Sequence, residues 1–488
     1  MSNPKSYKLG DPKAPKFPAK FDILEKAVLQ KTDVKANNNK YYAIELHSPA
    51  TKQKSVFRVF THYGRTDDLQ SNPDAGAKEC RYFTNVGAAR SCYQSIHRQK
   101  TGAGKGYKEV SLASSKIGSK QARGQSVGKI DSETLAKGAD AKKGGKKKAA
   151  AKTVAKKAVK KLDAPLQHLV DYIYAEATDA LQKSVDVTIT ANGIETPLGI
   201  LTLGQIEKGQ SALDGLQAEL MRARKRKATL AQLSSEFYSA IPHRVGRTRK
   251  AIEAAVINDM AKLVNKQDTL QLMRDMLSVS GGGEQAGHNV LYDGSAAEQY
   301  AALGCKIAPL APSSPKFAKW SKHVLDNQTY KGIKIVNLYE VQRPPERKVF
   351  KKAISNQKFL FHGSNIRNWV GILSRGILLP KAVVSMGGER TDEGWLGAGI
   401  YFSTESSTAA QYTARGRKGT SLMAIARVAL GKQARFTEIT YGLTAPPKGH
   451  HSCYGVSMEL DEESEFDDNE HVIYDARQQQ LEILVEFK

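Results

Sequence analysis

The sequence predicts a multidomain α+β protein with a small β-rich domain, an all-α bundle and a mixed α+β domain, in that order. Three observations support this prediction. The chain has 488 residues, a length typical of about three domains. β-Type runs with alternating character lie near its start, and apolar residues recur at helical spacing in its middle. Strand-like runs separated by glycine-rich loops dominate its last third.

The first domain is expected over residues 21–110, after a Pro- and Lys-rich tail, 1–20, that is expected to be disordered. The runs 41–46 and 55–61 are rich in aromatic and β-branched residues and predict strands. Asn85 precedes apolar residues at helical spacing, which predicts a helix with Asn85 as its N-cap.

Residues 111–162 are dominated by Lys, Ala, Gly and Ser, a composition typical of a linker. Within them, residues 141–161 hold ten lysines and no acid. Such a run is solvated, and it attracts nucleic-acid phosphates without reading their sequence. The same lysines are also typical of a nuclear address.

Residues 163–285 are expected to form a helical bundle. Asp163 is expected to cap the first helix and Thr202 the second. A strand-like piece at 185–189 lies between them, and a final helix is expected over about 265–277.

The last domain is expected over residues 286–488, after a flexible glycine joint at 281–283. A strand at 333–341 opens it, and the apolar run 421–430 predicts a core strand. The segment 469–487 has strand-like character to its end.

The net charge of +25 favours a polyanion as partner. An anionic membrane and solubility alone are the competing interpretations, but no basic amphipathic helix supports a membrane. The sequence has no apolar run long enough to span a bilayer and no apolar signal region near its start, so a secreted or membrane protein is not expected.

The cysteine pattern argues against a metal site. The four cysteines show neither CxxC nor zinc-finger spacing and are expected to be free thiols of a reducing compartment. His450, His451 and Cys453 cluster without further ligands, so no metal is expected there.

Four strings in the last domain bring chemically useful residues together: FLFHGS (359–364), GAGIYF (397–402), QY (411–412) and NEHVIYD (469–475). Glycines after strands let backbone approach a ligand closely. Histidine and tyrosine beside them offer hydrogen-bonding groups and flat faces.

In order and separation, these strings resemble the catalytic domain of the poly(ADP-ribose) polymerases. TPLGILTLGQI and FYSAIPH are similar to the family's helical regulatory domain. The first domain is similar to a WGR domain, with Tyr63-Gly64-Arg65 as its tripeptide, so tyrosine stands in place of tryptophan.

The resemblance implies that NAD is the substrate and that no metal takes part. It implies His362, Tyr401 and Glu470 as catalytic residues, and His362, Gly363, Ser364, Tyr401 and Tyr412 as NAD-binding residues. Breaking the nicotinamide–ribose bond develops positive charge on the ribose, which a carboxylate stabilises. Glu470 follows an acidic run, 459–468, but begins an apolar strand, which sets it apart from a solvated acid.

The resemblance also implies DNA ends or breaks as a partner. The implied DNA-binding residues are Tyr63, Arg65, Lys100, Lys146, Lys147 and Lys148. A tyrosine offers less stacking area than a tryptophan, and a core Tyr63 with a solvated Arg65 is the alternative interpretation.

The last domain departs from the family at two further positions. Ala409 occupies the place where relatives carry a serine that bonds the nicotinamide amide, with Ser407 or Thr408 as the nearest substitutes. Leu378 occupies the place of an arginine that contacts adenosine.

The implied function is a DNA-break-activated poly(ADP-ribose) polymerase whose acceptors are proteins, including itself, and growing chains. The helical domain would act as a lid, and an accessory factor is a further implied partner. The implied location is the nucleus in a eukaryote or the nucleoid in a bacterium. The alternative is a DNA-binding scaffold with a weakened transferase domain. A dehydrogenase is excluded because no strand–GxGxxG–helix unit with a following acid occurs.

Overall fold

The computed structural model describes most of the chain. The described residues are 4–49, 56–69, 71–72, 74–112, 114–115, 117–119, 162–185, 187–190, 193–242, 245–246, 248–280, 294–330, 332–379 and 394–488. The predicted basic run at 141–161 and glycine joint at 281–283 lie outside them.

The chain forms two compact units. The first takes in residues 1–156, 182–277 and 283–289, and the second takes in 157–181, 278–282 and 290–488. Together they hold a β-rich domain, a helical region and an α+β domain, so the predicted fold class is confirmed. The boundaries between the predicted domains stay predictions.

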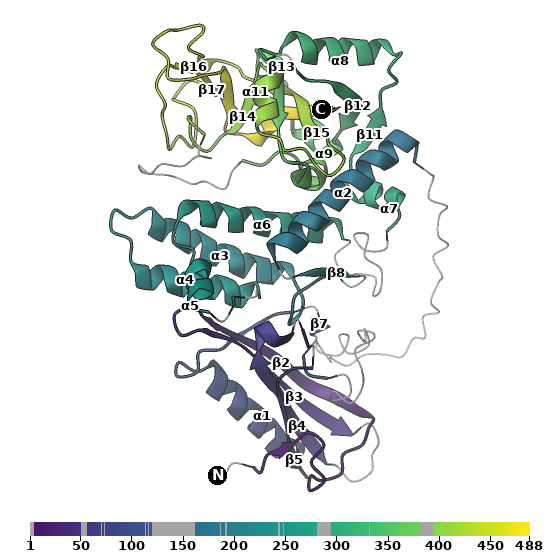
Figure 1. Cartoon of the computed structure of the whole chain (residues 1–488), viewed down its shortest axis with the longest axis vertical. Helices are drawn as coiled ribbons and strands as arrows, with labels where there is room; N and C mark the ends of the chain where they lie inside the picture. Colours follow the sequence, from purple (N-terminus) through teal and green to yellow (C-terminus); the bar gives the residue numbers. More distant parts are fainter. Residues whose placement is uncertain are drawn as a thin grey trace. The chain divides into compact units, whose positions relative to one another are not determined.

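A six-stranded antiparallel sheet with the order β1-β5-β4-β3-β2-β6 begins the first unit. Its strands are β1 (Tyr7–Lys8), β2 (Phe21–Asp33), β3 (Asn38–Pro49), β4 (Phe57–Arg65), β5 (Ala77–Phe83) and β6 (Lys108–Glu109). Helix α1 (Val86–Thr101) packs on it (Figure 1) through a core that includes Leu29, Ile44 and Tyr93. The Asn85 side chain accepts from the N–H groups of residues 87 and 88, which confirms the predicted cap.

The N-terminal tail differs from the expected disorder. Strand β1 pairs with β5. The rings of Tyr7 and Tyr82 contact each other edge to face, with their centres 5.9 Å apart. The guanidinium of Arg58 lies 4.2 Å from the centre of the Phe17 ring. Aromatic anchors therefore order a segment whose proline and lysine content suggested none.

The helical region contains α2 (Ala164–Ser184), α3 (Leu203–Leu220), α4 (Lys227–Ala240), α5 (Arg249–Ala255) and α6 (Met260–Val279), with short strands β7 (Ser114–Ser115), β8 (Thr188–Thr190), β9 (Gly193–Glu195) and β10 (Gly199–Ile200) in a small sheet. Both predicted caps are confirmed, since Asp163 accepts from the N–H of residue 166 and Thr202 from that of residue 205. Helix α6 starts earlier than predicted because Asp259 caps it.

Helix α4 docks on the sheet of the first unit. The Ser239 hydroxyl accepts the Thr32 N–H at 3.2 Å, and the Ser235 hydroxyl accepts the Val34 N–H at 3.1 Å. These bonds satisfy backbone groups at the end of β2, so the helical region and the β-rich domain share one hydrogen-bonded interface.

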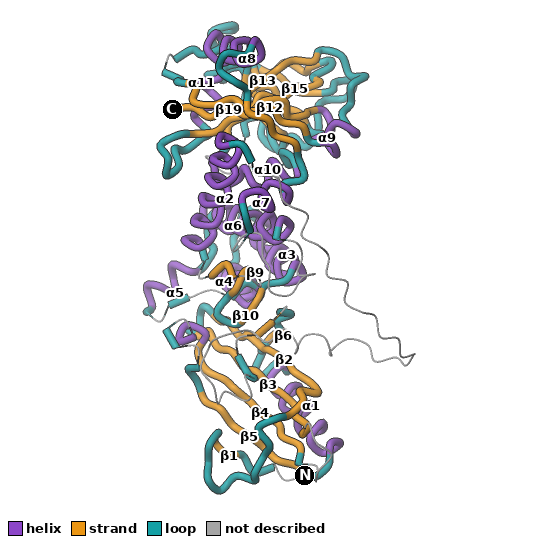
Figure 2. Tube along the Cα trace, turned by 90° about the vertical axis from the view of Figure 1, so that its right-hand side faces the viewer, coloured by secondary structure: helices purple, strands orange, loops and turns teal. Residues whose placement is uncertain are grey.

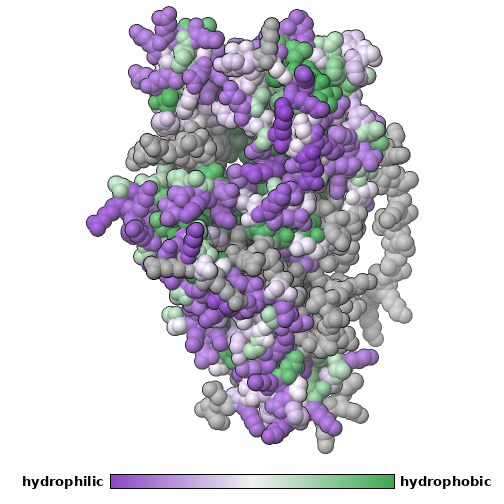
Figure 3. All heavy atoms as spheres, viewed as in Figure 1, coloured by the Kyte–Doolittle hydropathy of each residue, from purple (hydrophilic) through white to green (hydrophobic). Residues whose placement is uncertain are grey.

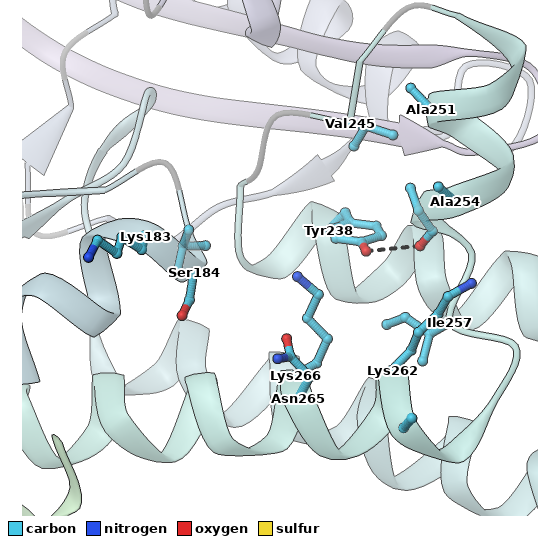
Figure 4. A pocket seen from close by; sticks show the side chains of 13 residues that line it. Lys183, Ser184, Tyr238, Val245, Ala251, Ala254, Ile257, Lys262, Asn265 and Lys266 are labelled. Atoms are coloured by element: carbon cyan, nitrogen blue, oxygen red, sulfur yellow. Dashed lines mark hydrogen bonds between the residues drawn. The ribbon is translucent and has the colours of Figure 1, made fainter. Parts of the chain in front are cut away.

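A hollow of about 660 Å³ lies among α4, α5 and α6 (Figure 4). Lys266 reaches into it toward the Tyr238 ring, whose centre is 5.8 Å from the ammonium nitrogen. Burial lowers the Lys266 pKa. No carboxylate among the described residues pairs with this ammonium.

A nine-stranded sheet forms the second unit, with the order β11-β12-β19-β15-β13-β14-β18-β17-β16. Its strands are β11 (Lys306–Pro309), β12 (Ile335–Gln342), β13 (Gln357–Gly363), β14 (Ile400–Ser403), β15 (Ser421–Ala429), β16 (Gln433–Phe436), β17 (Ser452–Gly455), β18 (Glu470–Ile473) and β19 (Gln479–Phe487). The strand-like segment 469–487 is thus two strands, because a 3-10 turn, Ala476–Gln478, interrupts it.

Short helices accompany this sheet: α7 (Ala296–Ala302), α8 (Pro315–Asp326), α9 (Pro344–Val349), α10 (Trp369–Arg375) and α11 (Ser406–Gln411). Figure 2 shows α8 and α10 on opposite sides of its strands. The core joins Trp320 of α8 to Phe361, Ile425 and Val485. Within the described part of the chain, no helix combines the length and apolar character needed to cross a bilayer.

The Lys266 ammonium is expected to contribute nothing to stability. Replacing it in Lys266→Met should leave the free energy of unfolding unchanged or raise it by up to about 1 kcal/mol, because a desolvated charge is removed. Lys262→Met is the contrasting variant. Lys262 donates to Val256 O and Asn258 Oδ1, so losing these hydrogen bonds should lower the free energy of unfolding. Urea unfolding of both variants checks this, and a larger loss in Lys266→Met would contradict it.

Candidate active site

His362 and Tyr401 lie on strands that separate from each other. Strand β13 pairs with β15 along its whole length, up to Gly363 opposite Met423. It pairs with β14 only through Phe361 and Ser403. Beyond that pair, a hydrogen bond of 3.0 Å between His362 Nδ1 and the Tyr401 carbonyl is what joins the two strands. The backbone at Gly363 is therefore not tied to β14 by strand pairing.

The bond to Tyr401 sets the state of the His362 ring. A carbonyl oxygen only accepts, so Nδ1 carries the hydrogen. Burial lowers the His362 pKa, which favours the neutral ring. Nε2 is then a hydrogen-bond acceptor, suited to a ligand hydroxyl.

Tyr401 is anchored at its hydroxyl. The oxygen accepts the Leu396 N–H at 2.9 Å and donates to the Gly397 carbonyl at 2.7 Å. Burial raises the pKa of this phenol, and the nearby Glu470 charge raises it further. The backbone at Gly394 passes so close to the ring that a Cβ there would lie 2.0 Å from Tyr401 Cζ. Tyr401 is thus a rigid wall of the site.

Gly363 allows α11 to approach β13. A Cβ at this position would lie 1.8 Å from the Ala409 carbonyl oxygen, so only glycine fits. Ala409 is 2 % exposed and belongs to the core. Tyr412 caps the C-terminal end of α11 with its side chain 63 % exposed, so its ring is open to a ligand.

Ser407 and Thr408, the nearest substitutes for the serine that the resemblance implies at Ala409, are both buried. The Ser407 hydroxyl is buried and accepts the Thr329 N–H at 3.0 Å. The Ser364 hydroxyl accepts from Asn368 Nδ2 at 3.0 Å. Leu378, at the position where the resemblance implies an arginine, is 46 % exposed and offers no polar group.

Glu470 is the first residue of β18, opposite Ser403 of β14 and Gly455 of β17. Its Oε2 atom is buried and has no hydrogen-bond partner among the described residues. Burial, with smaller contributions from the charges of Asp468 and Asp467, raises the Glu470 pKa to about 7. A carboxylate in this state is ready for a cationic or hydroxyl-bearing ligand.

Asn469 holds the start of β18 in place, and the motif analysis missed this role. Its Oδ1 accepts the Tyr454 hydroxyl at 2.6 Å and the Ser457 N–H at 3.2 Å. The side chain next to Glu470 is therefore locked to β17 and the loop after it. Its place in the string NEHVIYD was the only sequence signal for it.

Three of the predicted site residues come from consecutive strands of the sheet. His362, Tyr401 and Glu470 lie on β13, β14 and β18, which are neighbours in that order. The Glu470 charge acts on the hydroxyls of both Tyr401 and Tyr412, which brings the two tyrosines and the carboxylate into one electrostatic environment.

The predicted DNA-binding residues of the first unit are partly engaged. Tyr63 lies within β4 and stacks on Tyr42, with ring centres 5.2 Å apart, while its hydroxyl donates to Glu79 at 2.7 Å. Lys100 places its ammonium 4.2 Å from the centre of the Tyr42 ring. Lys146, Lys147 and Lys148 lie outside the described residues.

Arg65 belongs to a link between the sheet and the helical region of the same unit. Its guanidinium pairs with Asp67 at 3.3 Å and donates to the Asn37 carbonyl. Asp67 Oδ1 in turn accepts the N–H groups of Val245 and Gly246. Arg65 therefore helps to link the sheet to the helical region. The Tyr63-Gly64-Arg65 motif gave no indication that Asp67 takes part in this link.

No group of three or more His, Cys, Asp or Glu side chains within the described ranges is arranged to hold a metal. The four cysteines are free thiols.

Three family models match the chain. The poly(ADP-ribose) polymerase catalytic domain matches residues 314–488, the poly(ADP-ribose) polymerase regulatory domain matches 160–285, and the WGR domain matches 25–114. Each match covers the region that contains the corresponding sequence motifs.

Curated relatives agree. The chain is similar to poly [ADP-ribose] polymerase 2 of Homo sapiens, with 26 % identity over 89 % of this chain and 69 % of the relative. It is similar to the Arabidopsis thaliana protein of that name, with 25 % identity over 91 % of this chain and 66 % of the relative. It is also similar to the human protein mono-ADP-ribosyltransferase PARP4, with 32 % identity over 67 % of this chain. The chain spans only 18 % of that relative's length.

The Glu470 carboxyl is expected to titrate near pH 7. Its charged form is disfavoured in the folded state, so stability falls as pH rises from about 4.5, the ordinary value, to about 7. Glu470→Gln has no such loss. In thermal unfolding, the melting temperature of Glu470→Gln relative to that of the wild type should therefore rise as the pH increases across this range. A difference in melting temperature between the two proteins that does not change with pH would contradict the raised pKa of Glu470.

Proposed function

The chain belongs to the poly(ADP-ribose) polymerase family, and we propose that it is an NAD-dependent ADP-ribosyltransferase that is activated by DNA ends and builds poly(ADP-ribose) on proteins. The observation that carries the proposal is the buried, unpartnered carboxylate oxygen of Glu470 beside the strands that bear His362 and Tyr401. A structural carboxylate would be expected to have a partner.

The chain's residues suit the reaction. NAD supplies a nicotinamide–ribose bond whose cleavage leaves positive charge on the ribose. Ionised Glu470 stabilises that charge and holds the incoming hydroxyl. His362 Nε2 accepts from a ribose hydroxyl, the Gly363 backbone receives the amide of nicotinamide, and the exposed Tyr412 ring covers nicotinamide against the Tyr401 wall.

Polymer formation is supported by Glu470, because chain growth needs a group that holds the hydroxyl of an existing ADP-ribose unit. The similar proteins include one named a poly [ADP-ribose] polymerase and one named a mono-ADP-ribosyltransferase. Their names therefore do not distinguish polymer formation from single-unit transfer, and the distinction depends on the residues of the site. Ala409 removes one hydrogen bond to nicotinamide, at a cost of about 0.5–1.5 kcal/mol. This weakens NAD binding several-fold without removing a catalytic group. A DNA-binding scaffold is the second candidate, and Ala409 with Leu378 favours it.

Activation by DNA is supported by the first unit. The Tyr42–Tyr63 stack with Lys100 beside it combines a flat face with a cation, as nucleic-acid ends require. The bridge from Arg65 through Asp67 to residues 245–246 offers a path from this face into the helical region. The basic linker supports the same partner and, in a eukaryote, a nuclear location.

Restraint of the site is supported within the second unit, where α2 holds the segment that follows Tyr412. The Tyr172 hydroxyl donates to the Thr420 carbonyl at 3.0 Å, and Arg417 pairs with Glu176 at 3.1 Å. Loosening α2 would free the chain beside the nicotinamide wall.

The direct test is transfer of label from NAD to protein, with and without a short duplex that has 5′-phosphorylated ends. The wild type should give long, DNA-dependent ladders. Glu470→Gln should give single units or nothing, with DNA binding intact. An unlabelled wild type that still binds DNA would favour the scaffold.

Breaking the contact between α2 and the loop should raise activity without DNA. Because the Arg417–Glu176 pair is half exposed, Arg417→Gln should raise it only about two- to five-fold. The charge swap Arg417→Glu with Glu176→Arg is the matched control and should restore the basal rate. An unchanged rate in folded Arg417→Gln would argue against restraint by α2.

A further inference from the structure

The turn between α3 and α4 concentrates positive charge. Residues 222–227 read Arg-Ala-Arg-Lys-Arg-Lys, which places five cations in six residues, all exposed. Figure 1 shows α3 and α4 joined by this turn, and Figure 3 shows hydrophilic side chains standing out at that end of the helices. We call residues 222–227 the basic turn.

One buried acid holds the basic turn in shape. Glu219 is 3 % exposed, and its carboxylate accepts the Arg226 N–H at 2.7 Å and Nη2 at 2.6 Å. Arg222 Nη1 lies 3.5 Å from the same carboxylate. Arg224, Lys225 and Lys227 make no hydrogen bond or ion pair with the residues that the structure describes. Three neighbouring cations are thus presented to solvent on an ordered support.

The start of α4 contradicts the local rules for a stable helix. Arg226 stands at the N-cap, where its side chain makes no capping hydrogen bond to the helix backbone, and the first turn has no acid. Cations at the positive end of a helix repel its dipole, typically by a few tenths of a kcal/mol each. The Glu219 carboxylate compensates Arg222 and Arg226, but no anion among the described residues pairs with Arg224, Lys225 or Lys227. An external anion is therefore suited to these three cations.

The basic turn lies within reach of the predicted DNA-binding domain. Both belong to the first unit, and Ser235 of α4 is hydrogen-bonded to Val34 of β2. Lys227 precedes Ser235 by eight residues, which is about 12 Å along a helix. One turn of B-DNA spans about 34 Å. The basic turn therefore lies less than one turn of DNA from the end of β2 that α4 contacts.

We propose that the basic turn is a second DNA contact, which binds the phosphodiester backbone of the duplex whose end the β-rich domain holds. This inference rests on the DNA partner in the proposed function. Flexible point charges on a turn match a regular row of phosphates and read no base sequence. The contact lengthens the DNA footprint and ties the helical region to the bound duplex.

The test compares two triple variants of the full chain by fluorescence anisotropy with a 30-base-pair duplex. Arg224→Gln, Lys225→Gln and Lys227→Gln remove the free cations. Lys348→Gln, Lys352→Gln and Lys432→Gln remove the same charge from exposed lysines of the second unit. The first variant should weaken binding about 10- to 100-fold at 0.15 M salt and lower the log–log salt slope by about two to three. The second should match the wild type.

Equal affinity and slope in all three proteins would overturn the proposal. The proposal would also be overturned if the first triple variant bound DNA like the wild type and lost only binding to poly(ADP-ribose) or only nuclear import. The basic turn would then serve another partner. A wild type that binds no DNA would instead defeat the DNA partner itself. Glu470→Gln should bind DNA like the wild type, which separates this test from catalysis. Unfolding midpoints of the triple variants establish that they are folded.

Discussion

A carboxylate oxygen that is buried without a partner is costly, and Oε2 of Glu470 carries that cost at the start of β18. The surrounding structure keeps it in place. Asn469 locks the start of β18 to β17, and β14 pairs along the other edge. The same strand β14 carries Tyr401, whose carbonyl sets the tautomer of His362. Strand pairing thus positions the acid against Tyr401, and the hydrogen bond to the Tyr401 carbonyl positions the histidine.

The sequence predicted the fold class and the family, because the informative strings stand at strand ends where glycine and aromatic residues have few structural alternatives. The caps Asn85 and Thr202 were readable for the same local reason. The order of residues 4–20 was not readable, since it depends on pairing with β5, far along the chain. The shift of the Glu470 pKa also needs tertiary burial, which no local pattern contains.

The site residues themselves remain predictions of the resemblance, although the structure places three of them on neighbouring strands. The departures carry as much information as the matches. Ala409 is core-buried and its carbonyl abuts Gly363. In the proposed site, nicotinamide would therefore be held by backbone and by the tyrosines rather than by a side-chain hydroxyl. The links from Arg65 to residues 245–246 and from α2 to the loop after Tyr412 each lie inside one unit. The proposed signal from DNA and the proposed restraint of the site would thus have separate physical carriers.

Proton release on binding of a non-reactive NAD analogue would show whether the Glu470 carboxyl faces the bound ligand. The analogue must keep the positive charge of nicotinamide, and calorimetry in buffers of different ionisation enthalpy counts the protons. A cation beside Glu470 favours the ionised carboxylate, so the wild type should release close to one proton at pH 6 and almost none at pH 8.5. Glu470→Gln should release none at either pH. Equal release from variant and wild type at pH 6 would show that Glu470 does not face the ligand's charge.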